Sequence, residues 1–97
     1  MLTQKEAWLL IAVAFDNNEK ESLLPVNTRY GLCNAAYYLY SDDLVSFETL
    51  HKMTDQIRSK CPTGQDYFVK SFNQEARKFR AAKAREFAEE LSEITHE

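Results

Sequence analysis

The stretch that most constrains the fold is residues 29–40, RYGLCNAAYYLY. At helical spacing its apolar residues fall on one face: Leu32, Ala35, Ala36 and Leu39. Tyrosines lie on both sides of this face and widen it. A stripe this wide is typical of a helix packed on more than one side. We therefore expect this segment to be the central helix of a small bundle.

The composition also favours a helical protein. The chain has 97 residues, near the low end of the usual domain range, so we expect one helical domain covering residues 1–97. It contains only two glycines and two prolines. Few turns therefore need a positive backbone angle, which favours helices over a sandwich or barrel. We predict an all-α fold, a small bundle of about four helices with a long C-terminal helix.

The first helix is predicted close to the N-terminus. Thr3 and Glu6 form a capping-box pattern, in which the two side chains satisfy exposed backbone amides. Residues 8–15, WLLIAVAF, are apolar on every side, so we expect this helix to be buried on several faces. A second copy of the chain would complete such a core, most often as a two-fold dimer, and we expect a homo-oligomer.

Turn and capping residues mark the other helices. Residues 41–43, SDD, end the segment 29–40, and Ser46 is the expected N-cap of a third helix. The apolar stripe of that helix is expected to be Phe47, Leu50, Met53 and Ile57. Residues 61–64, CPTG, end it, and the longest segment covers residues 66–93.

Gly31 stands near the start of the segment 29–40. A glycine inside a helix costs about 1 kcal/mol relative to alanine. A backbone or a ligand that comes close at this position would explain it.

The aromatic residues divide between core and surface. Most are expected in the core, namely Trp8, Phe47, Phe72, Phe79 and Phe87. Tyr37, Tyr38 and Tyr40 point in different directions around one helix, so they cannot all face the same core. We expect at least one of them to reach the surface or another subunit, because tyrosine is favoured at interfaces.

A basic run in the last helix is the clearest candidate for binding. Arg77, Lys78 and Arg85 share one side of this helix with Ala81. Clustered arginines suit phosphate or carboxylate groups, because their forked donors match such oxygens; the alternative is a solvated helix face. The candidate ligand- or partner-binding residues are Arg29, Tyr30, Tyr37, Arg77, Lys78, Arg80, Lys83 and Arg85.

Catalytic and metal-binding patterns are weak. Cys33 and Cys61 are expected to be free thiols, and the two cysteines and two histidines lack zinc-ligand spacing. No phosphate-binding glycine loop is present. We expect no cofactor, no metal and no enzymatic activity. The alternative is an enzyme in which a cysteine meets His51.

Charge and hydropathy restrict the kinds of partner and the location that we expect for the chain. The formal net charge of −3 disfavours DNA as a partner, and a small nucleic-acid-binding regulator stays an alternative. The hydrophobic run of residues 7–15 is shorter than the roughly 20 residues of a membrane span. We expect a cytoplasmic protein without a membrane segment.

Three sequence patterns carry a resemblance to a known group of proteins. They are EAWL at residues 6–9, GLCNA at residues 31–35 and DYF at residues 66–68. With them, the chain resembles small accessory proteins encoded by tailed phages and prophages. The resemblance implies a non-enzymatic, anti-defence binding protein in the host cytoplasm. It would block a host protein or sequester an anionic nucleotide that serves as a defence signal.

Overall fold

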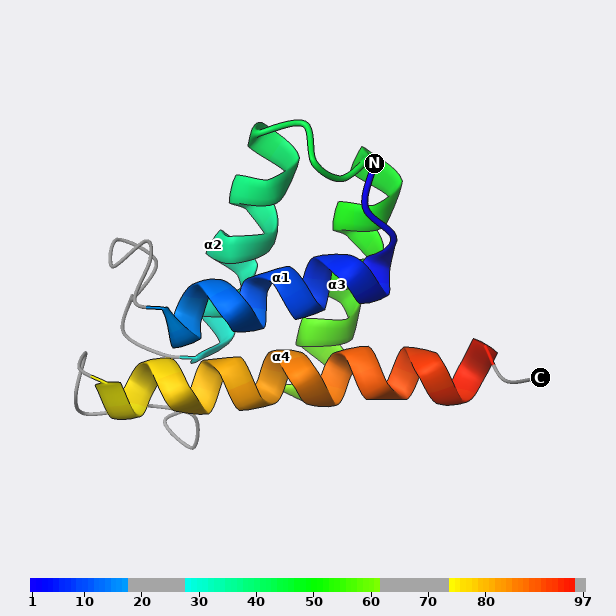
Figure 1. The fold of residues 1–97 in the computed structure, drawn as a ribbon. Coiled ribbons are helices and arrows are strands. Elements are labelled where there is room, and N and C mark those ends of the chain that lie inside the picture. Colours follow the sequence, from blue (N-terminus) through cyan, green and yellow to red (C-terminus); the bar gives the residue numbers. More distant parts are fainter. Residues whose placement is uncertain (18–27, 62–73, 96–97) are drawn as a thin grey trace.

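Two antiparallel helix pairs make up the fold. The computed structural model describes residues 1–17, 28–61 and 74–95. These residues form α1 (Gln4–Asp16), α2 (Thr28–Ser41), α3 (Phe47–Lys60) and α4 (Gln74–Thr95), with no strand among them. Figure 1 shows α1 lying antiparallel along α4, and α2 and α3 rising steeply from this pair as a helical hairpin. The predicted all-α bundle with a long last helix is confirmed.

Small residues allow α1 and α4 to pack closely. Ala7 and Ala12 of α1 and Ala81, Ala84 and Ala88 of α4 are all buried. Between them the rings of Trp8 and Phe87 meet edge to face, with centroids 4.9 Å apart. Val45, Met53 and Ile57 from the α2–α3 hairpin complete the same core.

The carboxamide of Gln56 joins three helices. Its Oε1 accepts hydrogen bonds from Trp8 Nε1 at 2.8 Å and from Gln4 Nε2 at 2.9 Å. Its Nε2 donates to Phe87 O at 3.1 Å and to Glu90 Oε2 at 3.2 Å. The amide therefore uses both donors and both acceptor sites, which fixes α3 against α1 and α4.

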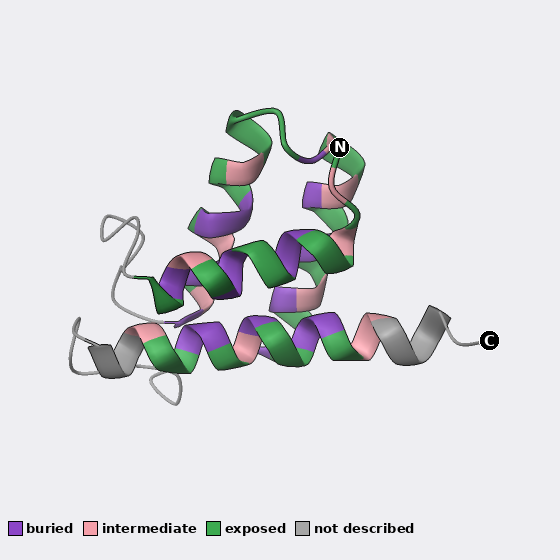
Figure 2. Ribbon diagram, viewed as in Figure 1, coloured by how far each residue is buried: buried purple, intermediate pink, exposed green. Residues whose placement is uncertain are grey.

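The first helix is buried on one side only, which corrects the expectation of burial on several faces. Ala7, Trp8, Ile11 and Phe15 face the core, whereas Leu9, Leu10 and Val13 are exposed. Figure 2 shows buried and exposed residues alternating along α1 in this way. The other helices cover only one of its sides, so the chain leaves an apolar face outside.

The segment 29–40 is also not the centre of the bundle. Its predicted inner face is confirmed, because Leu32, Ala35 and Ala36 are buried and Leu39 packs against the core. However, α2 packs mainly against α3, while its tyrosines face outward. The most extensive contact between helices is that of α1 with α4.

The helix ends are capped largely as expected. Thr3 and Glu6 form the predicted capping box, with Glu6 N to Thr3 Oγ1 at 3.1 Å and Thr3 N to Glu6 Oε1 at 2.9 Å. These bonds lower the pKa of the Glu6 carboxyl. Ser46 caps α3 by accepting from Thr49 N at 3.1 Å. Cys61 is the C-cap of the same helix.

Several predicted features fall outside the described residues. They include the predicted start of the last segment at Asp66, the DYF pattern at residues 66–68, and Phe72, which is expected in the core. Within the described ranges, no helix is both long and apolar enough to cross a membrane.

Candidate partner-binding surface

Four exposed rings form a continuous row across α2 and α3. Tyr37 and Tyr40 of α2 have centroids 6.3 Å apart, and Tyr40 lies 6.0 Å from Phe47 at the start of α3. Phe47 in turn stacks on His51, 6.4 Å away. We call Tyr37, Tyr40, Phe47 and His51 the aromatic row. Every spacing lies within the range of favourable aromatic pairs, so the rings support one another.

The turn between α2 and α3 brings these rings together. Leu44 N donates to Leu39 O at 2.9 Å and Asp43 N to Tyr40 O at 3.0 Å, which is the Schellman pattern of a helix end. Asp43 takes the left-handed conformation that this pattern requires, with φ 60°. The chain therefore reverses within a few residues, and the end of α2 meets the start of α3.

The start of α3 turns Phe47 outward, contrary to the expectation that it would lie in the core. Val45 and Leu50 are buried on either side of the Ser46 cap, at the two positions of a hydrophobic staple. These two residues fill the core at this helix end. Phe47 is left 67% exposed and Tyr37 60% exposed, so the row presents open ring surface.

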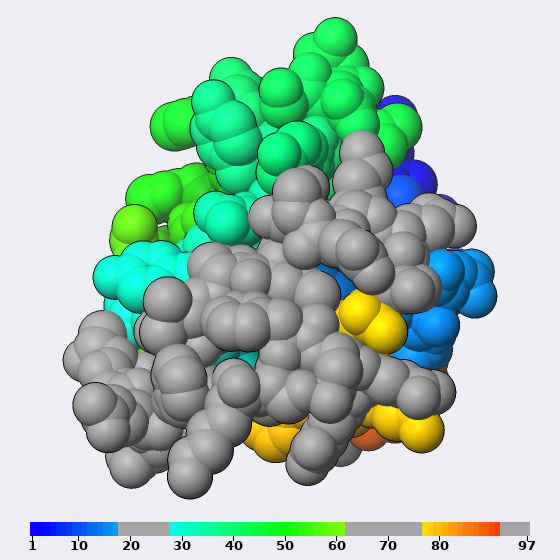
Figure 3. Space-filling view, turned by 90° about the vertical axis from the view of Figure 1, so that its left-hand side faces the viewer, coloured from blue at the N-terminus to red at the C-terminus, as the bar shows by residue number. Residues whose placement is uncertain are grey.

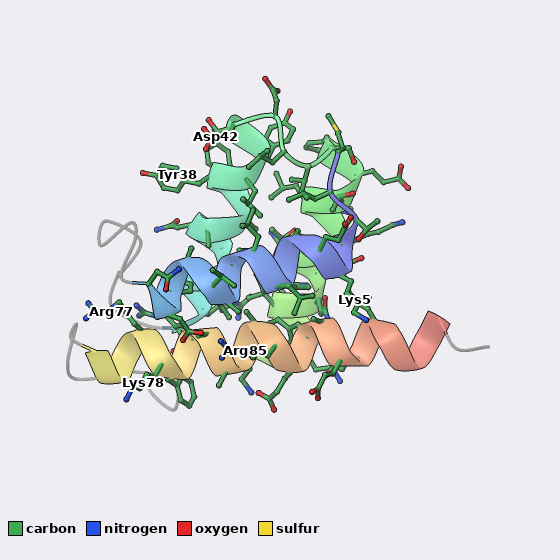
Figure 4. The ribbon with its side chains drawn as sticks, in the orientation of Figure 1. Lys5, Tyr38, Asp42, Arg77, Lys78 and Arg85 are labelled. Carbon is green, nitrogen blue, oxygen red and sulfur yellow. The ribbon has the colours of Figure 1, made fainter. Side chains whose placement is uncertain are left out.

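Acidic side chains surround the row. Asp42 and Asp43 follow Tyr40 in the turn, and neither forms an ion pair with another described residue. Glu48 pairs with Lys52 at 3.4 Å, and Asp55 approaches His51 Nε2 at 3.6 Å and Arg58 at 3.6 Å. Figure 4 shows Asp42 at the end of α2 that lies farthest from α4.

The basic run does not form one exposed face, which corrects the sequence interpretation. Arg80 is fully buried, and its Nε would lie 2.8 Å from a Cβ on Gly31. Ala81, on the side shared by Arg77, Lys78 and Arg85, is also buried. Burial lowers the pKa of Arg80. The close approach expected at Gly31 is thus present, but an arginine side chain makes it.

The other basic residues of α4 are engaged or spread apart. Lys83 pairs with Glu86 at 3.2 Å and its side chain is only 17% exposed. Arg85 pairs with Asp16 at the end of α1. Arg77 is half-buried and Lys78 exposed, and Figure 4 shows them extending to different sides of α4. The structure therefore brings no compact group of exposed arginines together on this helix.

The two remaining candidates lie at the start of α2. Arg29 is half-buried, and its Nη1 donates to Cys61 O at 3.4 Å. Tyr30 is 60% exposed but is not a member of the aromatic row. Figure 3 shows the green α2–α3 turn projecting at the top of the molecule, apart from the yellow start of α4. Tyr37 is thus the one predicted binding residue that lies in the row.

The thiols and His51 lie in different settings. Cys33 and Cys61 are both free. Burial raises the pKa of each thiol, and the positive charge of Arg29 opposes this only in part. His51 stacks on Phe47 at the surface and hydrogen-bonds to neither thiol within the described ranges. No group of three metal-ligating side chains occurs among the described residues.

Sequence reasoning missed three members of the row. The helical stripe places Phe47 in the core, His51 enters only through the enzyme alternative, and the candidate binding residues do not include Tyr40. The signal lies in two spacings, because Tyr37 precedes Tyr40 by three residues and Phe47 precedes His51 by four. A short polar connection between these pairs brings them together.

Comparison of the chain with protein-family models, curated proteins and solved structures found no match.

Proposed function

We propose that this chain is a non-enzymatic binding protein that attaches to a partner protein through the aromatic row. The observation that carries the proposal is a row of four neighbouring rings on an exposed surface of two helices. Tyrosine and other aromatic residues contribute most of the energy in many protein interfaces. Rings that already pack on one another lose little freedom on binding, which favours affinity.

The surroundings of the polar groups support binding rather than catalysis. The raised pKa of both thiols keeps them protonated at neutral pH, and a thiol is a poor nucleophile in that form. His51 is held against Phe47 and beside Asp55 rather than beside a nucleophile. The phage setting implied by the sequence resemblance makes a host protein the proposed target, blocked by an accessory protein.

A capture experiment with matched variants tests this proposal. The full chain is immobilised and exposed to bacterial lysate, and the captured protein is then purified and its affinity measured by calorimetry. Phe47→Ala is expected to weaken binding about 30-fold or more, as loss of a central aromatic contact does. Tyr30→Ala, an equally exposed aromatic residue outside the row, is the control and should bind as the unmodified chain does.

The proposal fails if Phe47→Ala binds the purified partner unchanged. A loss that is equal for Phe47→Ala and Tyr30→Ala would also contradict it, because the contact would then not be confined to the row. Circular dichroism of both variants shows whether they remain helical. Phe47 is mostly exposed, so its truncation should leave the fold intact.

An anionic nucleotide is a second candidate ligand, supported by the start of α4. Lys78 is exposed there and forms no ion pair with another described residue. Calorimetry with cyclic nucleotides tests it: a Lys78→Ala variant should bind at least about tenfold more weakly if this charge holds the ligand. Phe47→Ala should leave such binding unchanged, which separates the two candidates.

A further inference from the structure

Unpaired negative charge lies beside the aromatic row. Residues 37–58 contain four acidic residues, Asp42, Asp43, Glu48 and Asp55, and two basic residues, Lys52 and Arg58, so their net charge is −2. Lys52 pairs with Glu48 and Arg58 with Asp55, which leaves Asp42 and Asp43 without an ion pair to another described residue. Open aromatic surface and these two carboxylates coincide at one end of the molecule.

The exposed rings and the aspartate carboxylates both favour a positively charged group. An aromatic ring attracts a cation over its face, and arginine and lysine are the usual partners. Asp42 and Asp43 follow Tyr40 and Ser41 in the turn and have no ion-pair partner among the described residues, so their carboxylates are open to a guanidinium or ammonium group. An arginine at this site would lie over a ring and bind a carboxylate at the same time.

We propose that the partner presents a basic segment, rich in arginine or lysine, that lies along the aromatic row with its charges toward Asp42 and Asp43. This inference rests on the proposed function, because it specifies the partner of the same surface. Charge complementarity selects this occupant over a nucleic acid or an anionic membrane, which the negative charge of the row would repel. It also predicts faster association at low salt.

Selection from a display library of short random peptides tests the inference without knowledge of the natural partner. The immobilised full chain should enrich peptides rich in arginine and lysine. Their affinity should fall between about 0.1 M and 1 M salt, because the screening length falls from about 10 Å to about 3 Å. Phe47→Ala should abolish enrichment of these peptides.

Charge-neutralising variants supply the matched comparison. An Asp42→Asn/Asp43→Asn variant should bind the selected peptides about three- to tenfold more weakly at low salt and nearly as well as the unmodified chain at high salt. Asparagine tolerates the left-handed conformation of residue 43, so the turn is kept. Glu89→Gln on α4 removes an exposed charge far along the chain and should have no effect.

The outcomes separate the inference from the proposed function. One contrary result is that the selected peptides depend on Phe47 for binding and yet are neutral or acidic; another is that they bind equally well to the Asp42→Asn/Asp43→Asn variant. Either result would contradict the basic partner but not the aromatic binding surface. If no selected peptide depends on Phe47, both are contradicted. Self-association that Phe47→Ala abolishes would show that a second copy occupies the row, and would also overturn the inference.

Discussion

At the scale of single residues, the guanidinium of Arg80 explains why position 31 is a glycine. Arg80 is fully buried against α2, and a Cβ at Gly31 would lie 2.8 Å from its Nε and 3.0 Å from its Cζ. These distances are shorter than van der Waals contact, and a buried side chain has little room to move. The helix thus accepts a poor helix former to make space for an arginine.

Gly31→Ala should therefore destabilise the protein. Crowding in a packed core costs about 1–3 kcal/mol, and the better helix propensity of alanine returns only about 1 kcal/mol. In an Arg80→Leu background, which lacks Nε and Cζ, the same substitution should be neutral or stabilising. Urea unfolding of the unmodified chain, the two single variants and the double variant measures the coupling energy between residues 31 and 80. Equal effects of Gly31→Ala in both backgrounds would contradict the contact.

Gln56 gives a second test at this scale. Gln56→Leu should lower the free energy of unfolding by at least about 1–3 kcal/mol, because it leaves the buried indole N–H of Trp8 without an acceptor. Thr54→Ala, on the same helix, removes only a bond to the backbone oxygen of His51 at an exposed site and serves as the control. Denaturant unfolding followed by Trp8 fluorescence compares them. A loss no larger than that of Thr54→Ala would contradict the proposed network.

At the scale of elements, the α2–α3 turn decides where the aromatic row lies. The sequence indicates a helix break at residues 41–43 and a cap at Ser46, and both are present. The outward direction of Phe47 could not be predicted from periodicity. It depends on Val45, which precedes the helix and fills the core position that the helical stripe assigns to Phe47.

Asp43 is the residue at which this turn can be tested. Asp43→Gly should stabilise the protein slightly, by about 0.5 kcal/mol, because glycine adopts φ near 60° without a steric penalty. Asp43→Val should destabilise it by more than about 1 kcal/mol, because a β-branched side chain resists this conformation. Asp43→Ala removes the charge without adding a β-branched side chain, and its stability should lie between those of the glycine and valine variants. Thermal unfolding compares the variants. If Asp43→Val unfolds at the same temperature as Asp43→Gly, the left-handed conformation of residue 43 is contradicted.

At the scale of the whole molecule, the helix count and most of the core follow from sequence periodicity, whereas the exposed surfaces do not. Leu32, Ala35, Met53 and Ile57 lie inside as their spacing predicts. Periodicity reports only which residues of one helix share a face. It cannot show how many faces other helices cover, so it predicts more burial for α1 than the structure has and places Arg80 at the surface.

The homo-oligomer stays a prediction, because the exposed face of α1 is apolar and a second copy of the chain could cover it. Leu9, Leu10 and Val13 lie together on the side of α1 that no described element covers. We expect light scattering at micromolar concentration to show a dimer. A Leu9→Lys/Val13→Lys variant should then be a folded monomer, and Lys5→Ala on the same helix should remain dimeric. If the unmodified chain is a monomer at this concentration, the homo-oligomer prediction is wrong.

The central claim is that partners bind at the aromatic row rather than along the basic run of α4. An NMR titration of the isotope-labelled full chain with the purified captured partner or a selected peptide tests it most directly. The account predicts that the ring signals of Tyr37, Tyr40, Phe47 and His51 shift or broaden together, while the backbone amides of residues 77–85 stay in place. Shifts confined to residues 77–85, with the four ring signals unchanged, would contradict it.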